Sequence, residues 1–217
     1  MGQYFTNQDL DSNIIKHNVN VSGIDLIFNT DNGVFSKAKV DFGTRLLLEV
    51  VSPLISKGNI LDVGCGYGVI GIYFAKIGFN VDMIDINKRA LHLSEMNAKE
   101  NKVYCNIFES DIYSNVNEKY DYIITNPPIR AGKKVIYSIL KDAKDYLKEN
   151  GALYFVMRKN HGVKSTVLEL EKMYNISILK KKNGFYIIEA KKELTYWLNY
   201  VYNIDWQCII FVNMFFD

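Results

Sequence analysis

A glycine-rich segment, DVGCGYG over residues 62–68, begins at the end of an apolar run at 59–63. Alternate glycines let the backbone turn sharply and let a ligand approach it closely. The spacing is G-x-G-x-G, whereas dinucleotide sites usually have G-x-G-x-x-G. An acid two residues before the first glycine, Asp62, suits a ligand that carries an ammonium group. The alternative interpretation is a plain tight turn that binds nothing.

Two further acids follow the next two apolar runs at the corresponding place. Asp85 ends the second run, where an acid can accept hydrogen bonds from both hydroxyls of a ribose. Asp111 follows the third run, and with the apolar Ile112 it could hold the amine and the ring face of an adenine. Each acid alone could be a solvated loop residue. Three acids after three successive strands favour one shared ligand site.

The fourth apolar run, at 120–125, ends in Asn126-Pro127-Pro128-Ile129. Two consecutive prolines cannot continue a strand ladder, and they fix the direction of the backbone. Such a turn holds the Asn126 side-chain carbonyl and the Pro127 backbone carbonyl in one plane, so both can accept from an amino group on a flat ring. By accepting hydrogen bonds from the amino group, these oxygens would expose the lone pair of its nitrogen for attack. Correct orientation of two reactants can lower a reaction barrier by ~7–11 kcal/mol. A proline turn without chemistry is the alternative.

The elements that must position these residues are short apolar runs, which alternate along the chain with segments of helical periodicity. Fully apolar strands indicate a parallel sheet covered on both faces, so we predict a doubly wound, Rossmann-like α/β fold. The last two strands, at 176–180 and 185–190, are joined by a turn at 182–184 and predict an antiparallel strand at one edge. We therefore expect seven strands, the last one antiparallel, with the acids and Asn126 at the carboxyl edge of the sheet.

Three segments are expected along the chain. Residues 1–58, with a strand-like run at 24–28 and a helix at 43–51, should form an N-terminal extension packed on the core. Residues 59–192 should form the ligand-binding sheet domain. The aromatic-rich tail at 193–217 either packs on the sheet edge or on another subunit, or has no function.

Composition excludes several classes of protein. The 217 residues are 48% hydrophobic and 23% charged with a net charge of +2, which argues against disorder and against a polybasic protein. Three widely spaced cysteines argue against a disulfide framework and a structural zinc site, and we expect no metal. No stretch reaches ~18 apolar residues, and the N-terminus lacks signal-peptide features, so we expect no membrane contact and a cytoplasmic location.

Basic residues are concentrated in the second half of the chain. Residues 109–192 contain 16 Lys and Arg against 10 Asp and Glu. Arg130 and Lys133 follow the fourth strand, and Arg158 and Lys159 follow the fifth, so both clusters should lie beside Asn126. Arginine favours bidentate phosphate contact. The pattern therefore predicts an RNA partner, with a merely solvated basic rim as the alternative.

Together these motifs resemble class I S-adenosylmethionine-dependent methyltransferases. The string TNPPIRAGKK at 125–134, with GVFS at 33–36 and DFGTRLLL at 41–48, is similar to the small-subunit ribosomal RNA guanine-N2 methyltransferase family, especially its short single-domain bacterial members. The resemblance covers residues 22–192 and implies methyl transfer to the exocyclic N2 amine of a guanine in 16S ribosomal RNA. Because the duplicated N-terminal domain of the two-domain members is lacking, the same target nucleotide is not implied.

The resemblance also implies roles for individual residues. Asn126 and the Pro127 carbonyl would bind the guanine amine. The residues expected around S-adenosylmethionine are Thr44, Asp62, Gly64, Cys65, Gly66, Gly68, Asp85, Ile86, Asp111, Ile112 and Asn126. Those expected to contact the substrate are Phe35, Pro128, Ile129, Arg130, Lys133, Arg158 and Lys159. A stacked guanine must be extruded to reach Asn126, so Phe35 or Phe42 is expected to offer a stacking face.

Two other functions remain open. An amino methyltransferase acting on a protein glutamine or an adenine usually has an aromatic residue where this chain has Ile129. A non-catalytic RNA-binding assembly factor would not need the intact set of Asp62, Asp85 and Asn126. The sequence leaves open which guanine is modified, whether naked RNA or the assembled small ribosomal subunit is the substrate, and the oligomeric state.

Overall fold

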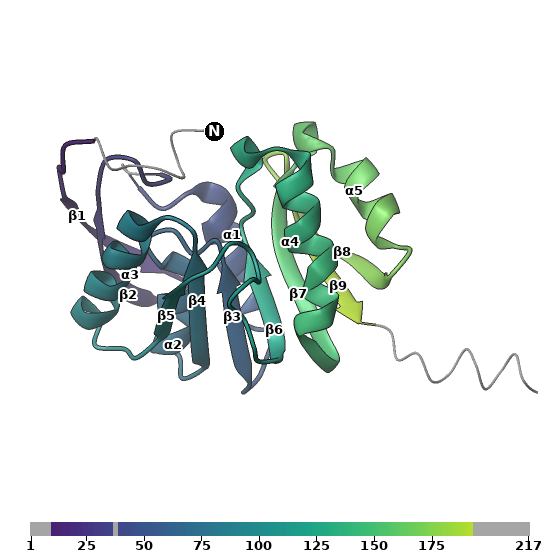
Figure 1. Ribbon diagram of the computed structural model, residues 1–217, viewed down its shortest axis with the longest axis horizontal. Coiled ribbons are helices and arrows are strands. Elements are labelled where there is room, and N and C mark those ends of the chain that lie inside the picture. The colour runs from purple at the N-terminus through teal and green to yellow at the C-terminus, as the bar shows by residue number, and fades with distance from the viewer. Residues whose placement is uncertain (1–9, 37–38, 193–217) are drawn as a thin grey trace, which may run out of the picture.

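A seven-stranded sheet forms the centre of the computed structural model, which describes residues 10–36 and 39–192 (Figure 1). The expectation for the tail at 193–217 lies outside these residues. The strands follow in the spatial order β5-β4-β3-β6-β7-β9-β8. Their bounds are β3 Asn59–Val63, β4 Asn80–Asp85, β5 Asn106–Glu109, β6 Tyr120–Thr125, β7 Leu147–Arg158, β8 Tyr174–Lys182 and β9 Phe185–Lys192.

Strands β3 to β7 pair in parallel, whereas β9 runs antiparallel to both of its neighbours, β7 and β8. The predicted doubly wound sheet with an antiparallel last strand is therefore confirmed. Strand β9 lies second from the edge and β8 forms the edge itself. The order reverses between β4 and β6 on either side of β3, and ligands bind at such a switch point, outside the carboxyl ends of the strands.

Helices cover both faces of the sheet (Figure 1). The first face carries α1 (Phe42–Val51), α2 (Val69–Lys76) and α3 (Lys88–Glu100), and the second carries α4 (Lys133–Tyr146) and α5 (Val163–Leu170). Successive strand residues point to opposite faces, so Ile60 lies in the core under the first three helices and Leu61 in the core under the other two. Burial on both sides explains the continuous apolar runs.

Helix α2 lies unusually close to β4. A Cβ added at Gly71, in the first turn of the helix, would stand 2.1 Å from the sulfur of Met83 on the strand. Both residues are buried, and Met83 is completely inaccessible. Glycine is therefore required here for the close approach of the helix to the sheet, and this packing fixes where α2 begins.

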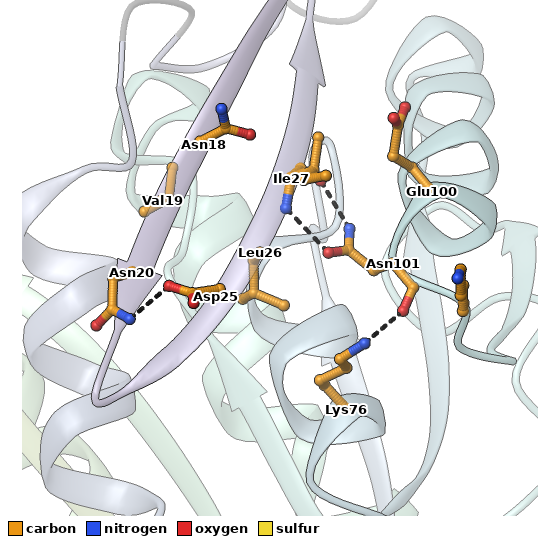
Figure 2. A pocket seen from close by; sticks show the side chains of 10 residues that line it. Asn18, Val19, Asn20, Asp25, Leu26, Ile27, Lys76, Glu100 and Asn101 are labelled. Atoms are coloured by element: carbon orange, nitrogen blue, oxygen red, sulfur yellow. Dashed lines mark hydrogen bonds between the residues drawn. The ribbon is translucent and has the colours of Figure 1, made fainter.

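A separate hairpin, β1 (Ile15–Val21) paired antiparallel with β2 (Ile24–Thr30), packs beside α3. The sequence predicted only a strand-like run at 24–28, so β1 was missed. Two asparagines one helical turn apart, Asn97 and Asn101, face the free edge of β2 and act as a partner strand. Asn101 accepts from the N–H of Ile27 (2.9 Å) and donates to its carbonyl (2.6 Å), as Figure 2 shows. Asn97 does the same with Asn29 at 2.7 and 3.0 Å.

A hollow of about 600 Å³ lies between this hairpin and the ends of α2 and α3, lined in part by Lys76, Glu100 and Asn101 (Figure 2). Helices that connect parallel strands run back toward the amino ends of those strands, and both helices end here just before the next strand begins. The hollow therefore lies at the amino edge of the sheet, opposite the acids and Asn126. It takes no part in the candidate site.

Within the described residues no helix is long and apolar enough to cross a membrane. The same part of the chain has no group of three or more His, Cys, Asp and Glu side chains that could hold a metal ion.

Candidate active site

The glycine segment forms the turn between β3 and α2 at the switch point of the sheet. The N–H groups of Gly64 and Cys65 both donate to the carbonyl of Ile84 at the end of β4, at 2.9 and 3.0 Å. The φ angles of Gly64, Gly66 and Gly68 are 71°, 58° and 92°, a backbone region that side chains disfavour. The turn is thus a rigid, side-chain-free surface at the carboxyl edge.

Asp85 links this turn to the end of β4. One carboxylate oxygen accepts from the N–H of Gly66 and the other from the N–H of Asn87, both at 2.9 Å. Burial raises the pKa of Asp85, and these backbone hydrogen bonds oppose that shift. The carboxylate has four acceptor positions in all, and the backbone N–H groups of Gly66, Asn87 and Ile86 leave room for a hydrogen bond from a ribose hydroxyl. Ile86 follows directly and is half-buried.

Asp62 lies beneath the turn and is completely buried. One of its oxygens accepts from the N–H of Gly71 at 2.9 Å, and the other has no hydrogen-bond partner in the described part of the chain. Burial raises the pKa of Asp62 to about 8. An unsatisfied buried carboxylate oxygen is costly, and a nearby cation would both satisfy it and lower this pKa. This unpaired acceptor therefore fits a ligand with an ammonium group.

The loop after β5 carries Asp111 and Ile112. The N–H of Ser110 donates to the carbonyl of Asp85 (3.1 Å), and the Ser110 hydroxyl donates to the carbonyl of Ile112 (2.9 Å). Ile112 has a φ of 54°, which is rare for a β-branched residue and costs about 1–3 kcal/mol. Asp111 is exposed and Ile112 is half-buried. Strain of this kind is typical of ligand clamps, and it presents these two side chains next to the end of β4.

Asn126 and the two prolines face the glycine turn from the end of β6. The Thr125 hydroxyl donates to the carbonyl of Val63 at 2.7 Å and ties the ends of β6 and β3 together. A Cβ added at Gly64 would stand 4.0 Å from Cδ of Pro128, so the two turns are in van der Waals reach. Pro127 is buried, whereas Pro128 and Ile129, where a short 3-10 helix begins, are half-buried.

The side-chain amide of Asn126 is held by α1. Its nitrogen donates to the Thr44 hydroxyl at 2.9 Å and to a carboxylate oxygen of Asp41 at 3.4 Å. Asp41 also caps α1, because the same oxygen accepts from the N–H of Thr44. Thr44 was predicted as a cofactor contact, whereas Asp41 was not predicted to belong to the site. The signal was present, since an Asp just before an apolar helical period is a typical N-cap.

Cys65 is a buried residue and not an open ligand of the turn. Its thiol lies 3.7 Å from the Ser94 hydroxyl, and burial raises the pKa of the thiol. Any contribution of Cys65 to ligand binding therefore comes from its backbone or its bulk and not from a thiolate.

The predicted substrate residues surround this edge. Arg130, Lys133, Arg158 and Lys159 are all exposed. The Arg158 guanidinium carbon lies 4.8 Å from the ring centre of Phe185, whose ring centre is 5.4 Å from that of Phe42. This row of side chains connects the end of β7 with the start of α1.

A shallow hollow of about 480 Å³ opens beside this row. It is lined by Arg158, Lys159, Asn160, Asn183 and Gly184. The two phenylalanines named in the sequence analysis differ in place: Phe42 begins α1 with 36% exposure, and Phe35 lies in the preceding loop with 54% exposure.

The chain is similar in sequence and fold to several known proteins. A Bacillus subtilis (strain 168) protein, the uncharacterized protein YbxB, is 45% identical over 77% of this chain and 87% of its own length. A Vibrio vulnificus (strain CMCP6) protein called ribosomal RNA small subunit methyltransferase C is 36% identical over 81% of this chain, which spans only 52% of that protein.

Among solved structures, the T. thermophilus 16S rRNA N2 G1207 methyltransferase, in complex with AdoMet and guanosine, superposes with a TM-score of 0.76. It is 24% identical, over 83% of this chain and 51% of that one, and so supports the fold. A profile of the methyltransferase small domain matches residues 25–189. The predicted resemblance to class I methyltransferases is therefore confirmed: the chain belongs to the methyltransferase small-domain family.

Proposed function

We propose that this protein uses S-adenosylmethionine to methylate the exocyclic N2 amine of a guanine in small-subunit ribosomal RNA. The observation that carries the proposal is the Asn126 amide, whose nitrogen is occupied by Thr44 and Asp41 beside the glycine turn. Within residues 10–36 and 39–192 its oxygen has no hydrogen-bond partner, and it can accept from an amine. The Vibrio relative that bears the name of a ribosomal RNA methyltransferase supports the choice of substrate, although this chain spans about half of that relative.

The methyl donor would bind at the carboxyl edge of β3, β4 and β5. When bound, S-adenosylmethionine supplies an electrophilic methyl group. Asp62 would balance the ammonium group of the donor, Asp85 would accept from its ribose hydroxyls, and Asp111 with Ile112 would hold its adenine. The turn at 64–68 would lie against its methionine part.

The protein's own contribution to the reaction is to orient the acceptor. Asn126 Oδ1 and the Pro127 carbonyl would accept hydrogen bonds from the two N–H groups of the guanine amine. Its lone pair, otherwise delocalised into the ring, would then point toward the methyl group. Pro128 and Ile129 would pack on the base. After transfer, the amine gives its extra proton to solvent, so no side chain need act as a base.

The RNA itself would lie on the exposed rim. Arg130 and Lys133 after β6, and Arg158 and Lys159 after β7, offer cationic contacts for phosphates on the side of the sheet away from the donor. Phe35 and Phe42 would offer apolar faces to an extruded base. We further propose that residues 1–58 form an N-terminal extension packed on the core, which contains Asp41 and Thr44. We also propose that the protein is cytoplasmic.

The test is methyl transfer from labelled S-adenosylmethionine to three acceptor pools. These are naked 16S RNA, small subunits from a strain that lacks this protein, and a ribosome-free protein extract of that strain. We expect label in RNA or subunits, and N2-methylguanosine after digestion to nucleosides. Label in methyladenosine or in protein would instead support the alternative amino methyltransferase. Cofactor binding with no transfer to any pool would support the assembly factor.

A further inference from the structure

The start of α1 contacts the amide that the proposed function places at the reacting amine. Thr44 Oγ1 accepts from Asn126 at 2.9 Å, and Asp41 Oδ2 accepts from the same nitrogen at 3.4 Å. An ionised carboxylate can only accept hydrogen bonds, whereas an amide has one accepting and one donating end. The contact with Asp41 is therefore possible only while the nitrogen of Asn126 faces α1. We propose that Asp41 and Thr44 are positioning residues that hold Asn126 in its accepting orientation, an inference that rests on the proposed function.

The orientation matters because the flipped amide would oppose the reaction. If Asn126 turned by 180° about its last side-chain bond, its NH₂ group would meet the NH₂ group of guanine. Two donors would then face each other, and the nitrogen lone pair would not be drawn toward the methyl group. The Pro127 carbonyl alone cannot fix the plane of the amine. Holding the amide is thus a condition for the geometry on which the proposed reaction depends.

The position of Asp41 is itself rigidly fixed. It caps α1 through the N–H of Thr44, at 3.2 Å. A Cβ added at Gly43 would stand 2.8 Å from the Phe185 ring and 2.9 Å from Asp41 Oδ2, so the first turn of α1 is pressed against both. Thr44 is buried, with 7% exposure. The two acceptors therefore cannot move away from Asn126 without shifting the helix.

The contact also polarises the amide. Hydrogen bonds in a chain strengthen one another, and a charged acceptor strengthens them further. The Asp41 carboxylate draws the N–H of Asn126, which increases the negative charge on Oδ1 and makes it a better acceptor. The guanine nitrogen becomes positive as it attacks, so this acceptor stabilises the transition state more than the ground state.

The test compares four variants with the wild-type protein. Thr44→Val removes the hydroxyl at nearly constant volume, and Thr44→Ser restores it. Asp41→Asn retains an N-cap oxygen but removes the charge. Thr166→Val is the matched control, because Thr166 is an equally buried threonine (3% exposed) on α5. For each we would measure kcat at saturating S-adenosylmethionine, the Kd of the cofactor, and the thermal unfolding midpoint.

We expect Thr44→Val to lower kcat by at least about tenfold, Thr44→Ser to recover most of it, and Asp41→Asn to lower it without loss of stability. The Kd of the cofactor and the activity of Thr166→Val should stay at the wild-type values. A Thr44→Val variant whose Kd rises while its kcat stays unchanged would overturn the proposal and leave Thr44 as a cofactor contact only.

A second readout needs no activity. The side-chain NH₂ signals of Asn126 can be assigned in an ¹⁵N NMR spectrum from their loss in Asn126→Ala. We expect slow solvent exchange of these protons in the wild-type protein, and faster exchange with a changed chemical shift in Thr44→Val and Asp41→Asn. Unchanged signals would overturn the positioning role. Inactivity of the wild-type protein toward guanine, together with the expected NMR changes, would refute the proposed function but not the contact.

Discussion

Asp62 provides the most quantitative prediction, because its environment should make the stability of the protein depend on pH. Its pKa is raised from 3.8 to about 8 by burial. In the unfolded chain the group loses its proton near pH 4, whereas in the folded protein it keeps it until near pH 8. Between these values the folded state binds one more proton than the unfolded state, so stability falls as pH rises and becomes constant above pH 8.

The size of the effect follows from the difference of one bound proton between the folded and the unfolded state. The free energy of unfolding should fall by about 1.4 kcal/mol per pH unit, or ~3 kcal/mol between pH 5 and pH 7. Asp62→Asn is the matched reference, because the amide imitates the protonated acid and retains the oxygen that accepts from Gly71. Taking the difference between the two proteins at each pH cancels the other titrating groups.

The assay is urea unfolding followed by circular dichroism at half-unit steps from pH 5 to pH 9. We expect the wild-type protein to lose stability relative to Asp62→Asn up to about pH 8 and no further. A difference that stays flat across pH 5 to 7, or that rises with pH, would refute the account of Asp62 as a protonated buried acid.

Three further predictions concern the packing of the hairpin and of α2, and the exposed basic residues at the carboxyl edge of the sheet. Asn97→Ala should destabilise the protein by about 2–4 kcal/mol in chemical unfolding, because it leaves the backbone N–H and carbonyl of Asn29 unpaired in a buried place. Gly71→Ala should cost ~1–3 kcal/mol by the same measurement, since its Cβ would overlap Met83. Arg158→Ala should raise the KM for RNA without changing the affinity for S-adenosylmethionine. The dependence of log KM on log salt concentration should become shallower by about the slope that one phosphate contact contributes.

Matched controls make these outcomes decisive. Asn80→Ala removes an exposed asparagine with a single 3.4 Å contact and should be neutral, so equal losses for it and Asn97→Ala would contradict the hairpin account. Met83→Ala combined with Gly71→Ala should cost less than the two single changes added together. Lys172→Ala removes a charge beyond the end of α5, away from the carboxyl edge, and an equal effect on RNA would indicate nonspecific attraction.

The central fold could be predicted because its signals are local. Strands β3 and β6 are short, mainly apolar runs, and each ends in a short motif of glycine or proline that breaks the ladder. The positions of Asp62, Asp85 and Asn126 at one edge follow directly from the parallel topology. Nothing more than chain order and the alternation of elements was needed to place them together.

The features that were missed depend on partners far away in sequence. From Lys16 onward, strand β1 alternates exposed residues with half-buried or buried ones. The hairpin is held by Asn101, which is 74 residues from Ile27. The contact of Asp41 with Asn126 joins residues 85 positions apart. The same residue types occur in ordinary loops and caps, so only the assembled fold shows that they meet.

The role of Asn126 is tested most directly by the single-turnover rate of methyl transfer in Asn126→Ala. The rate would be measured with saturating S-adenosylmethionine and with the RNA that the wild-type protein methylates. We predict a loss of about 10²–10³-fold with an unchanged affinity for the cofactor, because a preorganised hydrogen-bonding group at the reacting atom is removed. A rate within a few-fold of the wild-type value would contradict the claim that Asn126 holds the amine that receives the methyl group.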